Sequence, residues 1–234
     1  MNDGLPGTNG RRRVYLMRHG EVSYFDASGR AVNPDAVVLT ERGQSQARAM
    51  AELLHEIPLD RAGHTGLPRS AETARLVLAG HDIAPETHDG LREVRAGRLR
   101  DLPPDRVDAE FVYGMERAAE PGARFANGEA YIDFEVRVRA AFEALLLTPG
   151  WSRMLMVAHD GTNRAVLGWV TGGGLAAMGA FEQDPGCLNI IDVDVVDGEI
   201  VRKLVKALNL TPTNLAKHGN YLTSLEQVFH GSRA

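Results

Sequence analysis

The chain has 234 residues, of which 44% are hydrophobic and 24% charged, and it carries a formal net charge of −5. A chain of this length buries a sizeable core, and its composition is typical of an ordinary globular protein. The acidic balance argues against nucleic-acid binding through phosphate neutralisation, and no apolar run approaches the roughly 18 residues that span a membrane.

The chain contains one cysteine, Cys187, which excludes an internal disulfide and thiolate zinc cages. We therefore expect a reducing compartment and predict a cytoplasmic protein. Residues 1–12 lack the hydrophobic segment of a signal peptide, and we interpret them as a flexible N-terminal tail. Within and after this tail, Arg11–Arg13 are expected to be a solvated run rather than a binding patch.

The first predicted element is a short buried strand, because residues 14–17 are four apolar residues in a row. Arg18 and His19 follow at its carboxyl end, which is where open α/β sheets bind ligands. Arg18 has a fork of donors suited to phosphate or carboxylate, and His19 can act as nucleophile, base or metal ligand. Gly20 allows a sharp turn and the close approach of a ligand. By itself the triplet also fits a plain strand-to-loop transition.

Two helices are predicted after a loop over residues 22–38. Thr40 is a suitable N-cap for the first, whose apolar residues follow at helical spacing. The second begins near Arg69, whose positive charge lies at the positive end of the helix dipole. This placement is favourable when an anion lies between the arginine and the free N–H groups of the first turn. We therefore predict a ligand-binding role for Arg69.

Residues 82–94 are predicted to contain a connecting strand that leads to Glu93. From residue 95 to residue 128, Pro and Gly interrupt every regular pattern. A connection of this length favours an inserted lid over a structureless loop. We expect the aromatic side chains of Phe111, Tyr113 and Phe125 to pack the lid down rather than to line a pocket.

A long helix is predicted over residues 130–147, where apolar residues recur at helical spacing. Residues 154–158 then form a second continuous apolar strand, which also ends in a histidine, His159. The alternating residues 189–195 and the segment 200–208 are predicted to pair as a hairpin. Strands that alternate with helices indicate an α/β domain with a largely parallel sheet and an antiparallel edge.

Four side chains form the strongest candidate site. A histidine at a strand end is usually structural, but two such residues in this order favour a shared site. If the two apolar strands are neighbours, His19 and His159 converge on one pocket with Arg18 and Arg69. Two cations and two imidazoles suit a dianion, and a phosphate monoester is the natural candidate.

Five sequence blocks carry a resemblance to a known family. They occur in the family's order and spacing between about residue 14 and residue 165: Leu16-Met17-Arg18-His19-Gly20-Glu21, Leu39-Thr40 with Gly43 and Gln46-Ala47, Leu67 with Arg69-Ser70 and Thr73-Ala74, Leu91 with Glu93, and Val157-Ala158-His159. The chain resembles the histidine phosphatase superfamily, the phosphoglycerate mutase-like clan. This resemblance implies a three-layer α/β/α sandwich and a single catalytic domain over residues 13–234.

The resemblance also implies roles for the candidate residues. His19 is expected to be the nucleophile that takes the phosphoryl group onto a ring nitrogen. Arg18, Arg69 and His159 are expected to bind the phosphoryl oxygens. Glu93 is expected to protonate the leaving oxygen and then to assist the attack of water. No metal and no cofactor are expected, because the arginines neutralise the phosphoryl charge.

Some assignments stay open at this stage. Glu93 also fits a surface carboxylate, and the sequence does not show whether burial or the nearby arginines dominate its pKa. Glu21 is expected to orient Arg18 or to cap local backbone, and a role as a ligand is the alternative. The remaining histidines lack metal-ligand spacing: His55, His64, His81, His88, His218 and His230.

The chain departs from the pattern of mutase-type relatives. Val22-Ser23-Tyr24-Phe25 replaces a segment whose asparagine touches phosphate, so that contact is absent or is supplied by Ser23 or another group. Asp160 stands where many relatives have glycine, and residues 97–101 replace a Gly-x-x-Glu-Gly block. These departures favour a metal-independent phosphatase; a phosphoglycerate mutase and a catalytically silent phosphate binder are the alternatives.

The expected partner is a small phosphorylated metabolite, with no nucleic acid and no membrane. The edge hairpin is suited to pairing across a two-fold axis, which favours a homodimer over a monomer.

Overall fold

A computed structural model of the chain describes residues 10–98 and 101–231. At its centre is a six-stranded sheet in the order β3-β2-β4-β1-β5-β6. The strands are β1 (Arg11–Arg18), β2 (Arg61–His64), β3 (Glu86–Thr87), β4 (Arg153–Ala158), β5 (Leu188–Val196) and β6 (Glu199–Leu210). The first four strands run parallel, whereas β5 is antiparallel to both β1 and β6.

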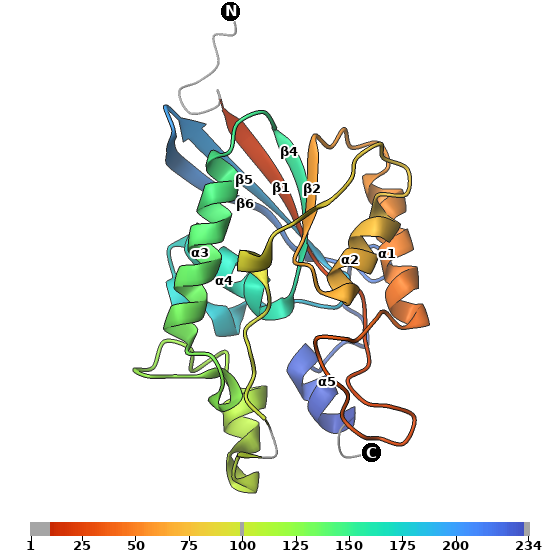
Figure 1. Cartoon of the computed structure of the whole chain (residues 1–234), viewed down its shortest axis with the longest axis vertical. Helices are drawn as coiled ribbons and strands as arrows, with labels where there is room; N and C mark the ends of the chain where they lie inside the picture. The colour runs from red at the N-terminus through yellow and green to blue at the C-terminus, as the bar shows by residue number, and fades with distance from the viewer. Residues whose placement is uncertain (1–9, 99–100, 232–234) are drawn as a thin grey trace, which may run out of the picture.

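Helices cover both faces of the sheet (Figure 1). On one face lie α1 (Glu41–Leu54) and α2 (Pro68–Val77), and on the other lie α3 (Tyr131–Leu147) and α4 (Asp160–Thr171). The C-terminal helix α5 (Ser224–Gly231) lies near the end of the molecule towards which β1 and β4 run. The shorter helices are η1 (Asp89–Leu91), η3 (Pro104–Arg106), the π-helix η4 (Asp108–Val112), η5 (Phe125–Asn127) and η6 (Gly174–Ala180). The predicted α/β/α sandwich with an antiparallel edge is confirmed.

The apolar run of β1 serves two cores because successive side chains of a strand point to opposite faces. Val14 and Leu16 pack in the core beneath α3 and α4, whereas Tyr15 and Met17 pack in the core beneath α1 and α2. The residues of β4 alternate in the same way. Because both faces are buried, neither strand shows the alternation of apolar and polar residues that marks a half-exposed strand.

Local signals in the sequence set several element boundaries. Thr40 accepts a hydrogen bond from the Gly43 N–H at 3.0 Å, so it is the N-cap of α1 as predicted. The hairpin of β5 and β6 turns at Asp197 and Gly198, whose φ angles are +52° and +82°. Positive φ at both positions is typical of the hairpin turn that an Asp-Gly pair favours.

The predicted tail is wrong for its last residues, and the predicted solvated arginine run is partly exposed but engaged in ion pairs. Arg11 and Arg12 already belong to β1, and residues 1–9 lie outside the described part of the chain. Arg11 pairs with Asp194 at 2.7 Å, and Arg13 pairs with Asp192 at 2.7 Å, both on β5. These aspartates are almost fully buried, so the arginines compensate their charges. The partners lie some 180 residues away in the sequence, where no local pattern reveals them.

Residues 82–94, predicted to contain a connecting strand, are less regular than expected. The connecting strand is reduced to the two residues of β3. In the predicted lid, Phe111 and Phe125 are buried and their ring centroids lie 5.7 Å apart, as expected of packing residues. Tyr113, by contrast, is 50% exposed. That residues 95–128 act as a lid stays a prediction.

No helix among residues 10–98 and 101–231 is both long enough and apolar enough to cross a membrane.

A substitution in α3 tests the assignment of its buried face. Phe134 is fully buried, so Phe134→Ala leaves a cavity and should lower the free energy of unfolding by about 3–5 kcal/mol. Ile132 on the same helix is 56% exposed, so Ile132→Ala should change it by no more than about 0.5 kcal/mol. Urea unfolding followed by circular dichroism measures both values. Equal losses in the two variants would contradict this orientation of α3.

Candidate active site

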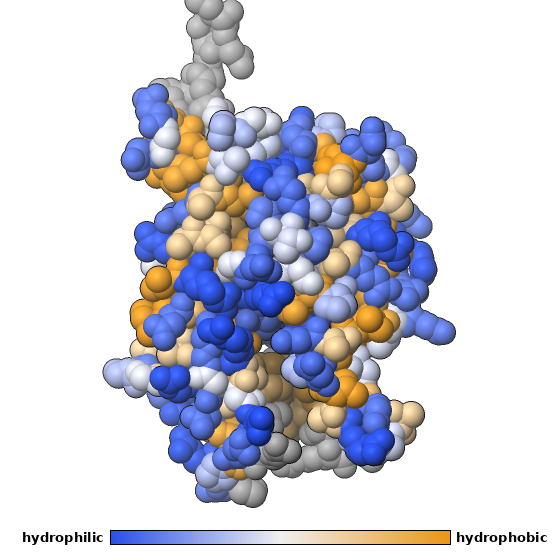
Figure 2. Space-filling model, in the orientation of Figure 1, coloured by the Kyte–Doolittle hydropathy of each residue, from blue (hydrophilic) through white to orange (hydrophobic). Residues whose placement is uncertain are grey.

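The candidate site lies where β1 and β4 end side by side. The two strands pair in parallel with Arg18 opposite Ala158, so the next residues, His19 and His159, leave the sheet at the same edge. Both imidazoles are buried, and their ring centroids lie 5.2 Å apart in an edge-on arrangement. The surface in Figure 2 is hollowed at the end of the molecule towards which β1 and β4 run in Figure 1.

His19 is held as a neutral imidazole with one nitrogen free. Its Nδ1 lies 2.7 Å from the carbonyl oxygen of Gly20, so Nδ1 carries the hydrogen and Nε2 keeps its lone pair. Burial, and then the charges of Arg69 and Arg18, hold the pKa of His19 well below its ordinary value. Gly20 is needed here because a Cβ would lie 2.4 Å from the carbonyl oxygen of Gly43. The result is the form of histidine that attacks phosphorus.

Arg69 reaches the same nitrogen from the first turn of α2. Its Nε donates to His19 Nε2 at 3.1 Å, and its Nη1 donates to the carbonyl oxygen of Pro34 at 2.6 Å. Neither contact neutralises the charge, although the side chain is only 3% exposed. A buried and uncompensated guanidinium beside a helix amino terminus is suited to an anion.

His159 is positioned by a residue that the sequence did not single out. Its Nε2 lies 2.7 Å from Oγ1 of Thr65, which follows β2, and its Nδ1 is buried without a hydrogen-bond partner. Thr65 Oγ1 also lies 2.9 Å from Ser70 Oγ. When Ser70 donates to Thr65 and Thr65 donates to Nε2, the hydrogen of the neutral imidazole is on Nδ1, which becomes a donor for an anionic oxygen. Burial and the neighbouring positive groups keep the pKa of His159 well below its ordinary value, so the ring is neutral.

Arg18 is the second buried arginine of the candidate site. Its Nη1 donates to the carbonyl oxygen of Gln183 and, at 2.5 Å, to the hydroxyl oxygen of Ser224. The Oδ2 atom of Asp160 lies 4.0 Å from the same nitrogen. The Nε atom is buried and unpartnered, so its N–H, besides those of Nη2, remains for a phosphoryl oxygen.

Glu93 lies at the amino end of α4. Its carboxylate oxygens accept hydrogen bonds from the backbone N–H groups of Gly161 at 3.1 Å and Thr162 at 3.2 Å. Burial, and then the negative charge of Asp160, raise the pKa of Glu93 against the lowering effect of these bonds and of a nearby arginine. Burial therefore decides the balance that the sequence left open. A Cβ at Gly161 would lie 2.6 Å from Glu93 Oε1, so only glycine lets the carboxylate come this close.

The structure shows the contacts of Ser23 and Glu21, two residues after His19 whose roles the sequence left open. The exposed Ser23 hydroxyl donates to the carbonyl oxygen of Phe25 at 2.7 Å and so takes no part in the site. Tyr24 is the residue of this segment whose pKa is influenced by the site. Burial raises the pKa of its phenol, and the charges of the two site arginines lower it. Glu21 accepts from Oγ1 of Thr40, the N-cap of α1, at 3.0 Å and pairs with Arg42 at 3.2 Å, so its contacts are with α1 rather than with Arg18.

Other titratable groups have structural surroundings. Cys187 is fully buried, and burial raises the pKa of its thiol to about 12, so it is an unreactive core residue. In the described part of the chain, no three His, Cys, Asp or Glu side chains gather where they would hold a metal ion.

Comparison with known proteins identifies the family. The model of the histidine phosphatase superfamily, branch 1, matches residues 14–205, a range that begins in β1 and ends in β6. The chain belongs to the histidine phosphatase superfamily. All five candidate residues of this histidine phosphatase lie within the matched range, and the predicted family is confirmed.

Individual relatives agree with this assignment. This histidine phosphatase is 32% identical over 190 residues to the adenosylcobalamin/alpha-ribazole phosphatase of Salmonella typhimurium, covering 77% of this chain and 90% of the relative. It is 31% identical over 164 residues to a "probable phosphoglycerate mutase" of Photorhabdus laumondii, covering 68% and 75%. The crystal structure of the alpha-ribazole phosphatase from Shigella flexneri superposes with a TM-score of 0.67 at 25% identity, covering 85% and 96%. The predicted enzyme class, a phosphatase of this superfamily, is confirmed.

The buried state of His19 predicts how stability depends on pH. Its pKa in the folded protein lies below the unfolded value of about 6.5, so the unfolded chain binds the proton first. The wild-type protein therefore loses stability as the pH falls below about 6.5. His19→Asn removes this effect, and the loss of unfolding free energy between about pH 7.5 and about pH 5.5 should shrink by about 1 kcal/mol.

Urea titrations at the two pH values measure this difference. The matched control is His218→Asn, at an exposed histidine outside the site, which should keep the wild-type pH dependence. If His19→Asn also kept it, His19 would not be a buried neutral imidazole.

Proposed function

We propose that this protein hydrolyses a phosphomonoester of a small metabolite through a phosphohistidine formed on Nε2 of His19. The observation that carries the proposal is the fixed tautomer of His19. Its Nδ1 hydrogen is held by the Gly20 carbonyl oxygen, and its Nε2 lone pair faces the guanidinium of Arg69. The nucleophilic nitrogen and the anion-binding guanidinium thus lie within hydrogen-bonding distance of each other.

In the first step, His19 Nε2 attacks phosphorus and the bond from phosphorus to the leaving oxygen breaks. In the structure, Arg69 donates to His19 Nε2. When the substrate enters, a phosphoryl oxygen replaces Nε2 as the acceptor of this hydrogen bond. Arg18 contributes its unpartnered Nε, and His159 contributes Nδ1. These donors neutralise the charge of the transferring group, which is the main requirement of phosphoryl transfer.

Glu93 serves as the acid and then as the base. Burial raises its pKa and so favours the protonated form that the leaving oxygen needs, and the alcohol departs uncharged. In the second step the same carboxylate takes a proton from water, whose oxygen attacks phosphorus as the P–N bond breaks. Inorganic phosphate leaves, and His19 is again neutral. Tyr24, whose pKa is influenced by the charges of this site, is a candidate contact for the leaving group.

The substrate class follows from the relatives and from the site. The relatives named as phosphatases of adenosylcobalamin and alpha-ribazole, and the mutase relative named after phosphoglycerate, point to small phosphorylated metabolites. We favour hydrolysis over mutase chemistry because Val22–Phe25 lacks the asparagine expected of mutase-type relatives. A cytoplasmic location and a homodimer stay predictions.

Replacing the nucleophile tests the proposal directly. His19→Ala should lower phosphate release from a panel of phosphomonoesters by at least about a thousandfold, because no other group supplies the attacking nitrogen. The panel includes alpha-ribazole phosphate, sugar phosphates and 3-phosphoglycerate, all assayed with EDTA present. Rapid quench with ³²P-labelled substrate should trap acid-labile, alkali-stable phosphate on the wild-type chain only.

The control for this experiment is His218→Ala, which should keep wild-type turnover and labelling. Turnover that survives in His19→Ala would sink the proposal. Isomerisation of phosphoglycerate that depends on a bisphosphorylated primer would replace it with the mutase alternative. Labelled phosphate that binds without any covalent intermediate would favour a silent phosphate binder.

The role of Glu93 predicts a dependence on the leaving group. Glu93→Gln should slow the release of a poorly leaving alkyl alcohol by about a hundredfold or more, since that oxygen needs a proton. p-Nitrophenolate leaves without protonation, so p-nitrophenyl phosphate should be affected much less. Steady-state and burst-phase rates on the two substrates measure the effect, with the exposed Asp89→Asn as control. Equal losses on both substrates would contradict the assignment of Glu93 as the acid.

A further inference from the structure

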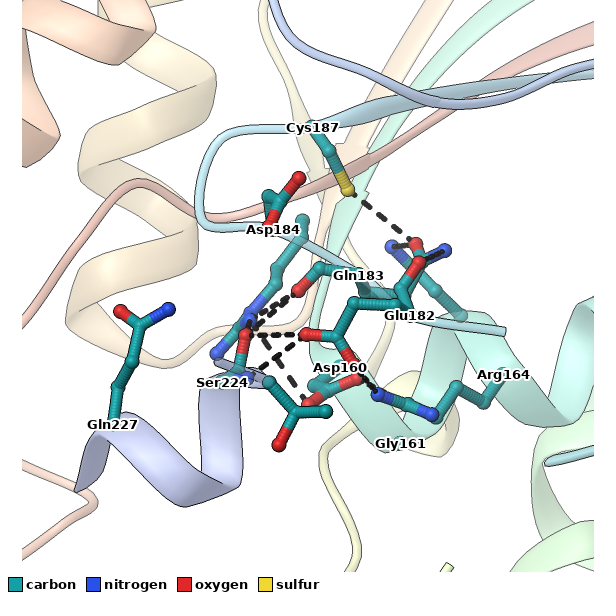
Figure 3. A network of polar contacts seen from close by, with 12 residues as sticks. Asp160, Gly161, Arg164, Glu182, Gln183, Asp184, Cys187, Ser224 and Gln227 are labelled. Carbon is teal, nitrogen blue, oxygen red and sulfur yellow. Dashed lines mark hydrogen bonds and ion pairs between the residues drawn. The ribbon is translucent and has the colours of Figure 1, made fainter. Parts of the chain in front are cut away.

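Arg18 belongs to a closed ring of five side chains drawn from four segments of the chain. Its Nη1 donates to Ser224 Oγ at 2.5 Å, and Ser224 Oγ lies 3.0 Å from Glu182 Oε1. Arg164 donates to the other oxygen of Glu182 at 2.6 Å and, through Nε, to Asp160 Oδ1 at 2.5 Å. The second oxygen of Asp160 returns to Arg18 at 4.0 Å. Most of this ring is visible in Figure 3.

The ring is buried and balanced in charge. Arg18, Asp160, Arg164 and Ser224 are each less than 9% exposed, and Glu182 is partly exposed. Two guanidinium groups are grouped with two carboxylates, and this moderates each charge, although the contact of Asp160 with Arg18 is long and Glu182 reaches solvent. Because a buried ion pair is costly when one partner is lost, the ring resists displacement of any single member.

Ser224 brings the C-terminal helix into this ring. It is the first residue of α5, and its backbone N–H and its hydroxyl both approach Glu182 Oε1, at 2.9 and 3.0 Å. The preceding Thr223 forms a reciprocal capping pair with Glu226, which fixes the start of the helix. Figure 3 shows Ser224 facing Glu182 and Gln183, whereas Gln227 on the next turn points away from the network.

Packing holds the helix in place. Leu225, Val228 and Phe229 of α5 are partly buried against the core that α3 and α4 cover. The helix is therefore seated by apolar contacts, and Ser224 is presented to Arg18 as a consequence.

We propose that Ser224, Glu182, Arg164 and Asp160 are positioning residues for Arg18, and that docking of α5 completes the phosphate-binding site. The proposal rests on the role of Arg18 as a phosphate ligand under the proposed function. Two acceptors, Ser224 Oγ and the Gln183 carbonyl oxygen, occupy Nη1 of Arg18. This fixes the rotation of the guanidinium and leaves its Nε unpartnered for the anion.

Without the Ser224 hydroxyl, one of the two acceptors is lost and the guanidinium gains rotational freedom. A hydrogen bond to a charged group is worth about 1.5 kcal/mol at the lower end, which corresponds to about tenfold in affinity. The loss should fall on the binding of the phosphoryl group and its transition state rather than on the remainder of the substrate.

Orthovanadate binding measured by titration calorimetry tests the proposal without requiring turnover. Ser224→Ala should weaken binding about tenfold and lower kcat for p-nitrophenyl phosphate by a similar factor. Glu182→Gln should weaken binding in the same direction, and the double variant should lose less than the product of the two factors, because both changes act through Arg18. The matched control is Gln227→Ala on the same helix, whose amide bonds only within its own segment, to Leu222 and Asn220, and which should bind within about twofold of wild type.

Urea unfolding of every variant separates positioning from folding. The inference would be overturned if Ser224→Ala bound vanadate as tightly as the wild type. It would also be overturned if the two losses multiplied fully in the double variant, or if Gln227→Ala lost as much affinity as Ser224→Ala. If the wild-type protein bound vanadate but hydrolysed no phosphomonoester, only the proposed function would be refuted. The vanadate affinities of the variants would still test whether the ring positions Arg18. Wild-type protein that binds no vanadate would overturn the inference, since Arg18 would then have no anion to meet.

Discussion

The active site depends on one backbone constraint, the parallel pairing of β1 with β4. This register places Arg18 opposite Ala158, and the two following histidines share one edge of the sheet. Two cores protect the register, because Leu16 and Met17 pack on opposite faces of the sheet. A slip by one residue would exchange the faces of every side chain in β1, so packing far from the chemistry determines where His19 lies.

The second constraint is electrostatic. A chain with a net charge of −5 concentrates buried positive charge at one point, and it does so without protonating either histidine. Burial and the two arginines keep both imidazoles neutral, which is the state that the proposed nucleophile His19 requires. The nearest carboxylate to Arg18 in the ring, Asp160, is occupied by Arg164, so the arginine charge is moderated but not cancelled.

The C-terminal helix gives the site a contribution from the far end of the chain. Ser224 and Arg18 are 206 residues apart in sequence and 2.5 Å apart in space. Burial of both partners makes this contact stronger than a comparable bond at the surface. Under the inference drawn above, the position of Arg18 depends on how the apolar residues of α5 pack against the core.

The sequence by itself determined the fold class and the identity of the central residues. Continuous apolar runs ending in Arg18-His19 and His159 indicate buried strands with polar carboxyl ends, and Arg69 stands out because its charge opposes the helix dipole. These signals are local, so they can be read without coordinates. The tertiary structure alone decided which groups surround them. Thr65 and Ser224 are unremarkable in sequence, and the pKa of Glu93 depends on how deeply folding buries it. Hydrogen-bond partners and desolvation are properties of spatial neighbours, and spatial neighbours exist only once the chain has folded.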